Sequence, residues 1–550
     1  MNRRRLRFIW CLLAVWILTS GFNNNQDFSQ KPEYLKSATY YSDDWVVNFW
    51  NSESAMMDQE LKKIAEDGFN SIILVVPWRE FQPETSPISY NPYALKKFDR
   101  VMKSAEKNGL WVQLRIGYTW DYYSHESVLP RYQSLIYQDI TKKAWLDYAK
   151  TIYERASAFP NFYGGFLTWE DFWDFVDAAA TMGRANTSIR MADLIGFRNF
   201  MMEHYTLEEV QELYGEELTG YDRIYLPNKE SPAFLAFYRF YDEFLNGLLA
   251  ETQTVFPQLS MEVRLDVDPV PDGKGGVAAA DHYATFPCGG APYTSTMFSV
   301  SMGQQNEGET VSAKSVLSEL NNYLDLTNFY SGGKPLYVDQ LLFVDNTEEY
   351  IHNARIKTEE LPQFLISAAP ILKQKTMGYG IWTYRNYTNN LIYNSQFALG
   401  EKEWSMGPGA SVVRHNGNMA ARLSGKGSQI SQNIGTRGGS RENKNVRVSF
   451  RADSSSLSTL IVTLGYGSML VNIKGNVQVD LDFGTMDFTR LTIACDDEEI
   501  FIDNVNVYNY EQDGHIYSRQ GEALDCLDAV RELNGYLTEQ AELPTEAVDN

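Results

Sequence analysis

The strongest chemical signal is a carboxylate at the end of an apolar run. Residues Phe162 to Glu170 have the pattern of a buried strand and end in Thr168-Trp169-Glu170-Asp171. A carboxyl group beside an aromatic ring at a strand end is desolvated, which raises its pKa toward the range of a proton donor. We therefore predict Glu170 as a general acid/base. Thr168 and Asp171 also match a helix capping box, so a role limited to capping stays open, above all for Asp171.

A second acid closes a later apolar run, Pro335 to Phe343, which contains Tyr337-Val338-Asp339-Gln340. Asp339 would face Glu170 across a shared cavity if both runs belong to one barrel. One acid could then protonate a leaving oxygen while the other attacks carbon or activates water, the pair that glycoside hydrolysis needs. The alternative is an aspartate that braces the turn after the strand.

A third acidic position lies in the run from Ser260 to Asp268, where four charged residues alternate and so share one face: Glu262, Arg264, Asp266 and Asp268. If this face points outward, water solvates them. If it points inward, they need one another or a ligand. Glu262 then competes with Asp339 for the second catalytic role, and Arg264 adjusts their charges.

Aromatic and basic side chains end several other predicted strands. A single aromatic residue at such a position is more often core than a sugar platform, but several together favour stacking on sugar rings. We predict that the sugar site includes Arg79, Arg115, Trp120, Trp169, Asp171, Tyr283 and Trp382.

The predicted site residues can meet only in a fold that brings the ends of several strands close together. Short apolar runs alternate with amphipathic segments such as Met57 to Gly68, the pattern of a parallel sheet wrapped by helices. No glycine-rich phosphate turn is present, which favours a (β/α)8 barrel over a doubly wound sheet. The eight predicted strands are 46–49, 71–78, 111–118, 162–170, 260–268, 281–286, 335–343 and 378–384.

The rest of the chain suggests a second folded unit. The barrel is expected at 38–389 with a helical insertion at 171–258, which is too long for an ordinary barrel loop. From residue 390 to 515, short alternating strands rich in Ser, Thr, Gly and Asn predict an antiparallel β-sandwich. A C-terminal helix and tail, 516–550, complete the prediction.

The N-terminus and the overall charge indicate where the protein acts. Arginines precede an apolar run within residues 1–21, typical of a signal peptide, with an uncleaved membrane anchor as the alternative and a linker at 22–37. The net charge of -23 disfavours nucleic acid as a partner. Four cysteines are too few for a disulfide scaffold, although a Cys495–Cys526 bridge stays open. We expect an exported, extracellular or cell-surface protein.

The predicted barrel resembles the clan of retaining (β/α)8 glycoside hydrolases, both cellulase-like and lactase-type β-galactosidase-like. The resemblance rests on Asp67 to Trp78 (DGFNSIILVVPW), on the tryptophan strand that ends at Trp382, and on the segment from Phe197 to Tyr214. It implies that Glu170 is the acid/base and that Asp339 occupies the nucleophile position.

Two positions depart from the clan. The Asn that usually precedes the acid/base is Trp169, and the nucleophile Glu is Asp339, which is shorter by one methylene. Loss of reach would favour an inverting mechanism or loss of activity.

The second unit resembles the jelly-roll carbohydrate-binding modules of secreted glycanases, on residues 390–397, Trp404, 430–434 and 502–505. That resemblance implies a structural Ca2+ in the sandwich. No cofactor is expected for catalysis.

The sequence thus predicts an exported glycoside hydrolase that cleaves a β-linked oligo- or polysaccharide. Two alternatives stay open. One is a non-catalytic surface glycan-binding protein on a decayed barrel, suggested by Trp169 and Asp339. The other is a hydrolase that edits the cell's own exopolysaccharide, suggested by an anchored N-terminus.

Overall fold

The computed structural model describes residues 28–117, 129–168, 185–228, 231–263, 269–271, 277–279, 289–300, 308–344, 354–434, 446–495, 499–512 and 514–538. Several predicted features lie outside these residues. They are the signal or anchor at 1–21 and the site residues Trp120, Trp169, Glu170, Asp171, Arg264 and Tyr283.

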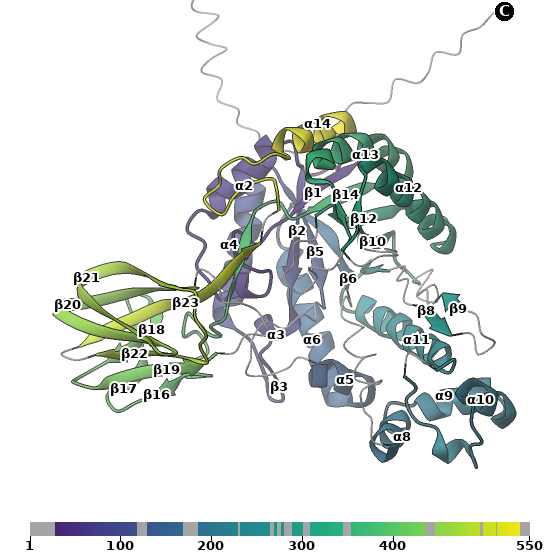
Figure 1. Cartoon of the computed structure of the whole chain (residues 1–550), viewed down its shortest axis with the longest axis horizontal. Helices are drawn as coiled ribbons and strands as arrows, with labels where there is room; N and C mark the ends of the chain where they lie inside the picture. Colours follow the sequence, from purple (N-terminus) through teal and green to yellow (C-terminus); the bar gives the residue numbers. More distant parts are fainter. Residues whose placement is uncertain are drawn as a thin grey trace, which may run out of the picture.

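Eight parallel strands form a closed barrel in the order β1-β14-β12-β10-β7-β6-β5-β2 (Figure 1). Every pairing in this sheet is parallel, including those of β1 with β14 and with β2 that close it. The predicted (β/α)8 barrel is therefore confirmed. The strands are β1 Leu35–Thr39, β2 Ser71–Val76, β5 Trp111–Ile116, β6 Phe162–Leu167, β7 Ser260–Glu262, β10 Thr294–Ser299, β12 Leu336–Leu342 and β14 Gly378–Trp382.

Two predicted strands were wrong. The first strand is β1, which begins within the expected 22–37 linker and ends beyond it, at Thr39. Residues 46–49 instead lead into a 3-10 helix at Asn48–Trp50. The sixth strand is β10, not 281–286. Both true strands look polar (LKSAT and TSTMFS), yet every residue in them is buried. Some of their polar side chains have partners inside the fold: Ser37 Oγ lies 2.5 Å from Ser71 Oγ, and Thr296 donates to the backbone oxygen of Val263 at 2.8 Å. Hydrophobicity alone therefore does not reveal these two strands.

Amphipathic helices cover the barrel. In α4, Asn91 caps the start by accepting hydrogen bonds from the backbone of Tyr93 and Ala94. The helices around the barrel are α2 Met57–Glu66, α3 Trp78–Phe81, α4 Pro92–Lys107, α5 Leu129–Tyr137, α6 Asp139–Ala156, α11 Phe234–Gln253, α12 Ala313–Tyr330 and α13 Leu361–Lys375. Short two-stranded ribbons, β3–β4, β8–β9 and β11–β13, join some of these elements at Glu84–Thr85, Ile88–Ser89, Pro269–Pro271, Val277–Ala279, Thr310–Val311 and Arg355–Ile356.

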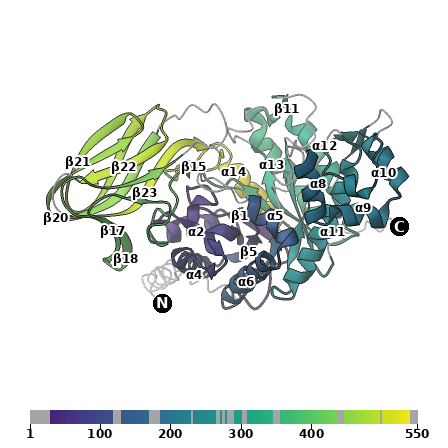
Figure 2. The ribbon, with the colours of Figure 1, turned by 90° about the horizontal axis from the view of Figure 1, so that it is seen from below.

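The long insertion after β6 is helical, as predicted. It contains α8 Ala185–Leu194, α9 Phe197–His204 and α10 Leu207–Tyr214. Figures 1 and 2 both place these helices on the side of the barrel away from the sandwich. The insertion and the sandwich therefore extend from opposite flanks.

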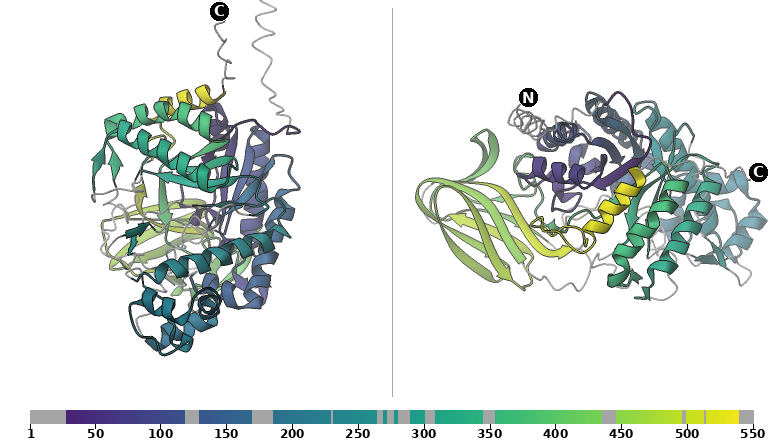
Figure 3. Two further views of the ribbon diagram at one scale, coloured as in Figure 1. Left: turned by 90° about the vertical axis from the view of Figure 1, so that its right-hand side faces the viewer. Right: turned by 90° about the horizontal axis from the view of Figure 1, so that it is seen from above.

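The last helix, α14 Leu527–Thr538, packs on the barrel although the sandwich precedes it in the chain. Its apolar residues Val530, Leu533 and Leu537 join the barrel core. Asn534 accepts a hydrogen bond from Tyr379 of β14 and donates to the backbone of Asp67. Because β14 is the eighth barrel strand, α14 takes the place of the eighth helix, and the sandwich is inserted between them (Figure 3).

The inserted unit is an antiparallel β-sandwich, which confirms the second half of the predicted fold. Its strands follow the order β16-β19-β22-β20-β23-β18-β17, with β15 on β23 and β21 on β20. They span β15 Tyr387–Asn390, β16 Ser405–Met406, β17 Ala410–His415, β18 Asn418–Leu423, β19 Ser428–Asn433, β20 Val446–Leu464, β21 Gly467–Gly484, β22 Arg490–Cys495 and β23 Ile500–Gln512. Cys495 and Cys526 are both buried, and no disulfide bond joins them.

Among the described residues, no helix combines the length and the apolar character that crossing a membrane requires.

Candidate active site

A layer of polar and aromatic side chains fills the barrel below the strand ends. Tyr337 donates a hydrogen bond to Ser37 at 2.7 Å, and Gln113 donates to Tyr293 at 2.6 Å. Burial raises the pKa of both tyrosines, and the negative charge of Asp339 adds to the shift. The phenols therefore stay neutral. This polar and aromatic layer forms the floor below the Arg115 cluster described next.

Above the floor, Arg115 of β5 joins the ends of three other strands. Its Nη2 lies 2.8 Å from Glu262 Oε2 and 3.1 Å from Thr168 Oγ1, and Thr168 donates to the same Glu262 oxygen at 2.5 Å. Its Nε lies 3.9 Å from Asp339 Oδ2. Gln340 Oε1 accepts from both Nη atoms, each at 2.7 Å. Strands three, four, five and seven thus meet at one guanidinium.

This cluster settles which way Glu262 faces. Glu262 ends β7 and points into the barrel, where its side chain is 2% exposed and paired with Arg115. A buried carboxylate needs such a countercharge, since transfer of an unpaired charge from water is costly. The inward alternative therefore holds for Glu262, while its predicted companion Arg264 lies outside the described residues.

Asp339 is the middle residue of β12 and lies beside Arg115. Its side chain is fully buried, and β12 carries a register irregularity on both sides of it, toward β10 and toward β14. A bulge at a strand end re-aims a side chain, and bulges are common next to active sites. A glycine at position 380 makes room here, because a Cβ on it would lie 2.6 Å from the backbone oxygen of Asp339.

Trp382 ends β14 and forms one wall of the mouth with residues from the segment after β1. Its ring lies 5.3 Å from that of Tyr41 and 5.7 Å from that of Trp45, and Tyr387 packs on both of these. The peptide bond between Trp382 and Thr383 is cis. The four rings form one buried aromatic cluster, in which Trp382 is 6% exposed and Tyr41 is 2% exposed.

Arg79, another predicted sugar contact, follows β2 and is 4% exposed. Its Nε lies 3.3 Å from Glu80 Oε1, and its guanidinium lies over the ring of Tyr393 at 5.9 Å. Glu80 Oε2 accepts a hydrogen bond from Asn51 at 2.7 Å. Arg79 therefore joins the barrel to the first residues of the sandwich, whereas Arg115 joins the strand ends.

Sequence reasoning missed three members of this site. Gln340 was visible in the strand-seven motif beside Asp339. Tyr41 and Trp45 follow the true first strand, so placing β1 at residues 35–39 would have brought both to the mouth.

A metal role finds no support in the described residues, where no group of three or more His, Cys, Asp or Glu side chains converges. The asparagines expected around a sandwich Ca2+ are bonded to other groups. Asn390 donates to Asn506, and the Asn504 side-chain oxygen accepts from Gln396. Calcium takes six to eight oxygen ligands, and these two contacts do not test that prediction, so the structural Ca2+ stays a prediction.

Comparisons with known proteins find similar solved structures at low sequence identity. The chain matches no known family profile and no curated protein. Among solved structures it is similar to the exo-β-1,4-mannosidase Op5Man5 of Opitutaceae bacterium strain TAV5, with 14% identity over 64% of this chain and 52% of that chain, at a TM-score of 0.40. A GH5_18 protein from Streptomyces cattleya has 12% identity over 65% of this chain and 72% of that chain, at a TM-score of 0.40. The β-galactosidase of the psychrophilic Marinomonas ef1 has 12% identity over 64% of this chain and 54% of that chain, at a TM-score of 0.44.

The aligned part spans about half the length of the mannosidase (52%) and of the β-galactosidase (54%). The (β/α)8 barrel of this chain is defined by its own strand pairing.

Proposed function

We propose that this chain is an exported glycoside hydrolase that cleaves β-linked oligo- or polysaccharide. The observation that carries the proposal is the meeting of Arg115, Glu262 and Asp339, where Glu262 ends β7 and an irregularity at Asp339 interrupts β12. Catalytic groups of (β/α)8 enzymes come from the carboxyl ends of the strands. The signal-like residues 1–21 support export.

In the proposed mechanism Asp339 is the nucleophile and Glu170 the acid/base. Arg115 supplies the countercharge that an ionised nucleophile needs in a buried position. Glu262 already binds Arg115 and Thr168, so we assign it to positioning that cation. Thr168 belongs to the same strand end that leads into Glu170.

The sugar itself would stack on Trp382, with Tyr41 and Trp45 behind it. We keep Trp120, Trp169, Asp171, Arg264 and Tyr283 as proposed sugar contacts, and Arg79 as a more distant one. The reaction as proposed uses carboxylates alone and needs no cofactor.

The test is hydrolysis of a panel of β-linked glycans by the purified full chain, by Glu170→Gln and by Asp339→Asn. Both variants should lose about a thousandfold in kcat. The anomer of the first product, followed by NMR, reports retention or inversion. Turnover that is unchanged in either variant removes that residue from the mechanism.

One observation favours a second candidate, a glycan-binding protein without catalysis. Asp339 is fully buried and one methylene shorter than the glutamate of the clan. Calorimetry would then show binding across several glycans while no product forms. Product release from any of them excludes this candidate.

A further inference from the structure

A separate pocket of about 230 Å³ lies where α2, the segments after β1 and β14, and the turn at residues 517–521 meet. This is the seam at which the chain returns from the sandwich to the barrel. Four tyrosines line the pocket: Tyr40, Tyr41, Tyr384 and Tyr517. Ligand sites often form at such junctions, with mostly apolar walls and a few polar groups.

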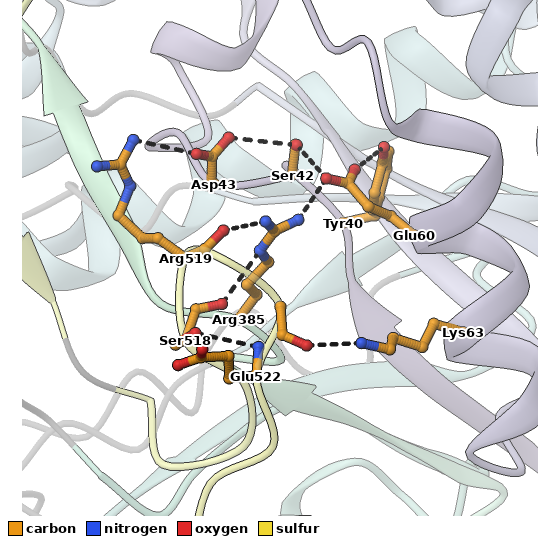
Figure 4. Close-up of polar contacts among 10 residues, drawn as sticks. Tyr40, Ser42, Asp43, Glu60, Lys63, Arg385, Ser518, Arg519 and Glu522 are labelled. Carbon is orange, nitrogen blue, oxygen red and sulfur yellow. Dashed lines mark hydrogen bonds and ion pairs between the residues drawn. The ribbon is translucent and has the colours of Figure 1, made fainter.

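The strongest charges around the pocket are engaged with one another (Figure 4). Arg385 donates to Glu60 and to the backbone oxygens of Ser518, at 3.3 Å, and Arg519. Glu60 also accepts from Tyr40 and Ser42, each at 2.8 Å. A ligand therefore meets an Arg385–Glu60 pair that is already neutral and hydrogen-bonded.

The turn that closes the pocket is held in shape. Lys63 donates to the Gly521 oxygen at 2.7 Å and lies 4.3 Å from the centre of the Tyr517 ring. Arg519 forms an ion pair with Asp43 at 3.0 Å. Within the turn, the Gly521 and Glu522 amides both donate to Ser518. The pocket is thus preorganised, which reduces the entropic cost of binding.

The polar groups of the pocket that can still bond a ligand are suited to ligand hydroxyl groups. An ammonium has three N–H donors, and among the described residues Lys63 uses one of them in a hydrogen bond. The Gln59 and Gln520 amides stand exposed on two sides of the pocket and can both donate and accept. Tyrosine rings supply faces for C–H groups. The chain's charge of -23 disfavours anions.

We propose that this pocket is a second binding site for a neutral sugar residue, separate from the catalytic mouth. The sugar class rests on the proposed function, whereas the pocket does not. Tyr41 lines the pocket and also contacts Trp382, so a sugar bound here would share a wall with the mouth.

The test uses the full chain carrying Glu170→Gln, so that no turnover occurs. Methyl β-glycosides of glucose, galactose and mannose are the neutral probes, and glucuronate is the anionic one. Hydrogen exchange then reports on amides in residues 517–524. Gln520→Trp and Gln59→Trp fill the pocket from two exposed rims. Gln478→Trp, at an exposed position of β21, is the matched control.

We expect at least one neutral glycoside to slow exchange in this turn. Both filling variants should weaken its apparent affinity about tenfold or more, while Gln478→Trp should not. Glucuronate should bind more weakly than the neutral sugars. The proposal is overturned if no neutral glycoside protects the turn, if protection survives both filling variants, or if glucuronate binds as tightly.

The two proposals fail separately. Protection of residues 517–524 in a protein that hydrolyses no glycan keeps the second site and rejects the catalytic function. Hydrolysis without such protection does the reverse.

Discussion

The two buried aspartates Asp339 and Asp67 differ in the contacts that their carboxylates make. At the mouth, Asp339 and Glu262 share one cation, and the Asp339 oxygen lies 3.9 Å from Arg115. On the outer wall, Asp67 accepts hydrogen bonds from Tyr384, Tyr517 and Arg531 at 2.7, 2.9 and 2.9 Å.

The difference separates a chemical role from a structural one. A buried carboxylate with several short hydrogen bonds holds elements together, and here Asp67 ties α2 to α14 and to the segments around the sandwich. Asp339 and Glu262 instead lie around one guanidinium inside the barrel, and clusters of interacting ionisable groups are typical of functional sites.

The largest effect is expected from Asp339→Asn. Its kcat should fall about a thousandfold, because an amide cannot attack carbon. Its free energy of unfolding should stay level or rise, since one of two acids around Arg115 is removed. Steady-state kinetics and urea unfolding measure both quantities, with exposed Asp480→Asn as control. A large loss of stability would place Asp339 in the structural class with Asp67.

Asp67→Asn should show the opposite behaviour. The amide presents N–H groups to donors, so the variant should lose about 3 kcal/mol of stability. Its kcat per folded molecule should stay unchanged. Asp528→Asn is the matched control, because Asp528 also pairs with Arg531 but is 97% exposed. Equal stability of the two variants would contradict the role given to Asp67.

Glu262→Gln tests whether positioning is the task of that residue. The amide oxygen still accepts from Arg115 but carries no charge, so kcat should fall about 10- to 100-fold with little change in KM. Thr168→Val should act in the same direction, and Thr168→Ser should retain activity because it keeps the hydroxyl. A loss as large as that of Asp339→Asn would exchange the two assigned roles.

The smallest effect concerns Asp242 of α11, whose pKa burial raises to about 8. The folded state then binds a proton that the unfolded state releases near pH 4, so stability falls as pH rises from about 4 to 8. Asp242→Asn should remove this slope and gain about 1 to 2 kcal/mol at pH 8. Thermal unfolding across pH checks this, with exposed Glu243→Gln as control. An unchanged slope would show that Asp242 has a countercharge.

Prediction from sequence succeeded where hydrophobicity and structure coincide. Runs such as Ser71–Val76 and Trp111–Ile116 are buried on both faces and read as strands. It failed for β1 and β10, because these strands are rich in buried polar residues, some of which bond only to residues distant in the chain. Ser37, for example, forms hydrogen bonds with Ser71 and Tyr337, and no local sequence pattern predicts these partners.

The candidate site divides in the same way. Strand position predicted that Arg115, Glu262, Asp339 and Trp382 would come to the mouth, and all four lie at barrel strands. The inward orientation of Glu262 stayed open, because alternation defines a shared face but not its direction.

By itself, the sequence determined the barrel, the sandwich and the acids at the strand ends, since these depend on local periodicity and on residue type. Only the tertiary structure decided that Arg115 serves both Glu262 and Asp339, and that Asp67 is structural. It also showed that the eighth helix arrives after the sandwich. Each of these depends on contacts between segments hundreds of residues apart, whose geometry is set by closure of the barrel.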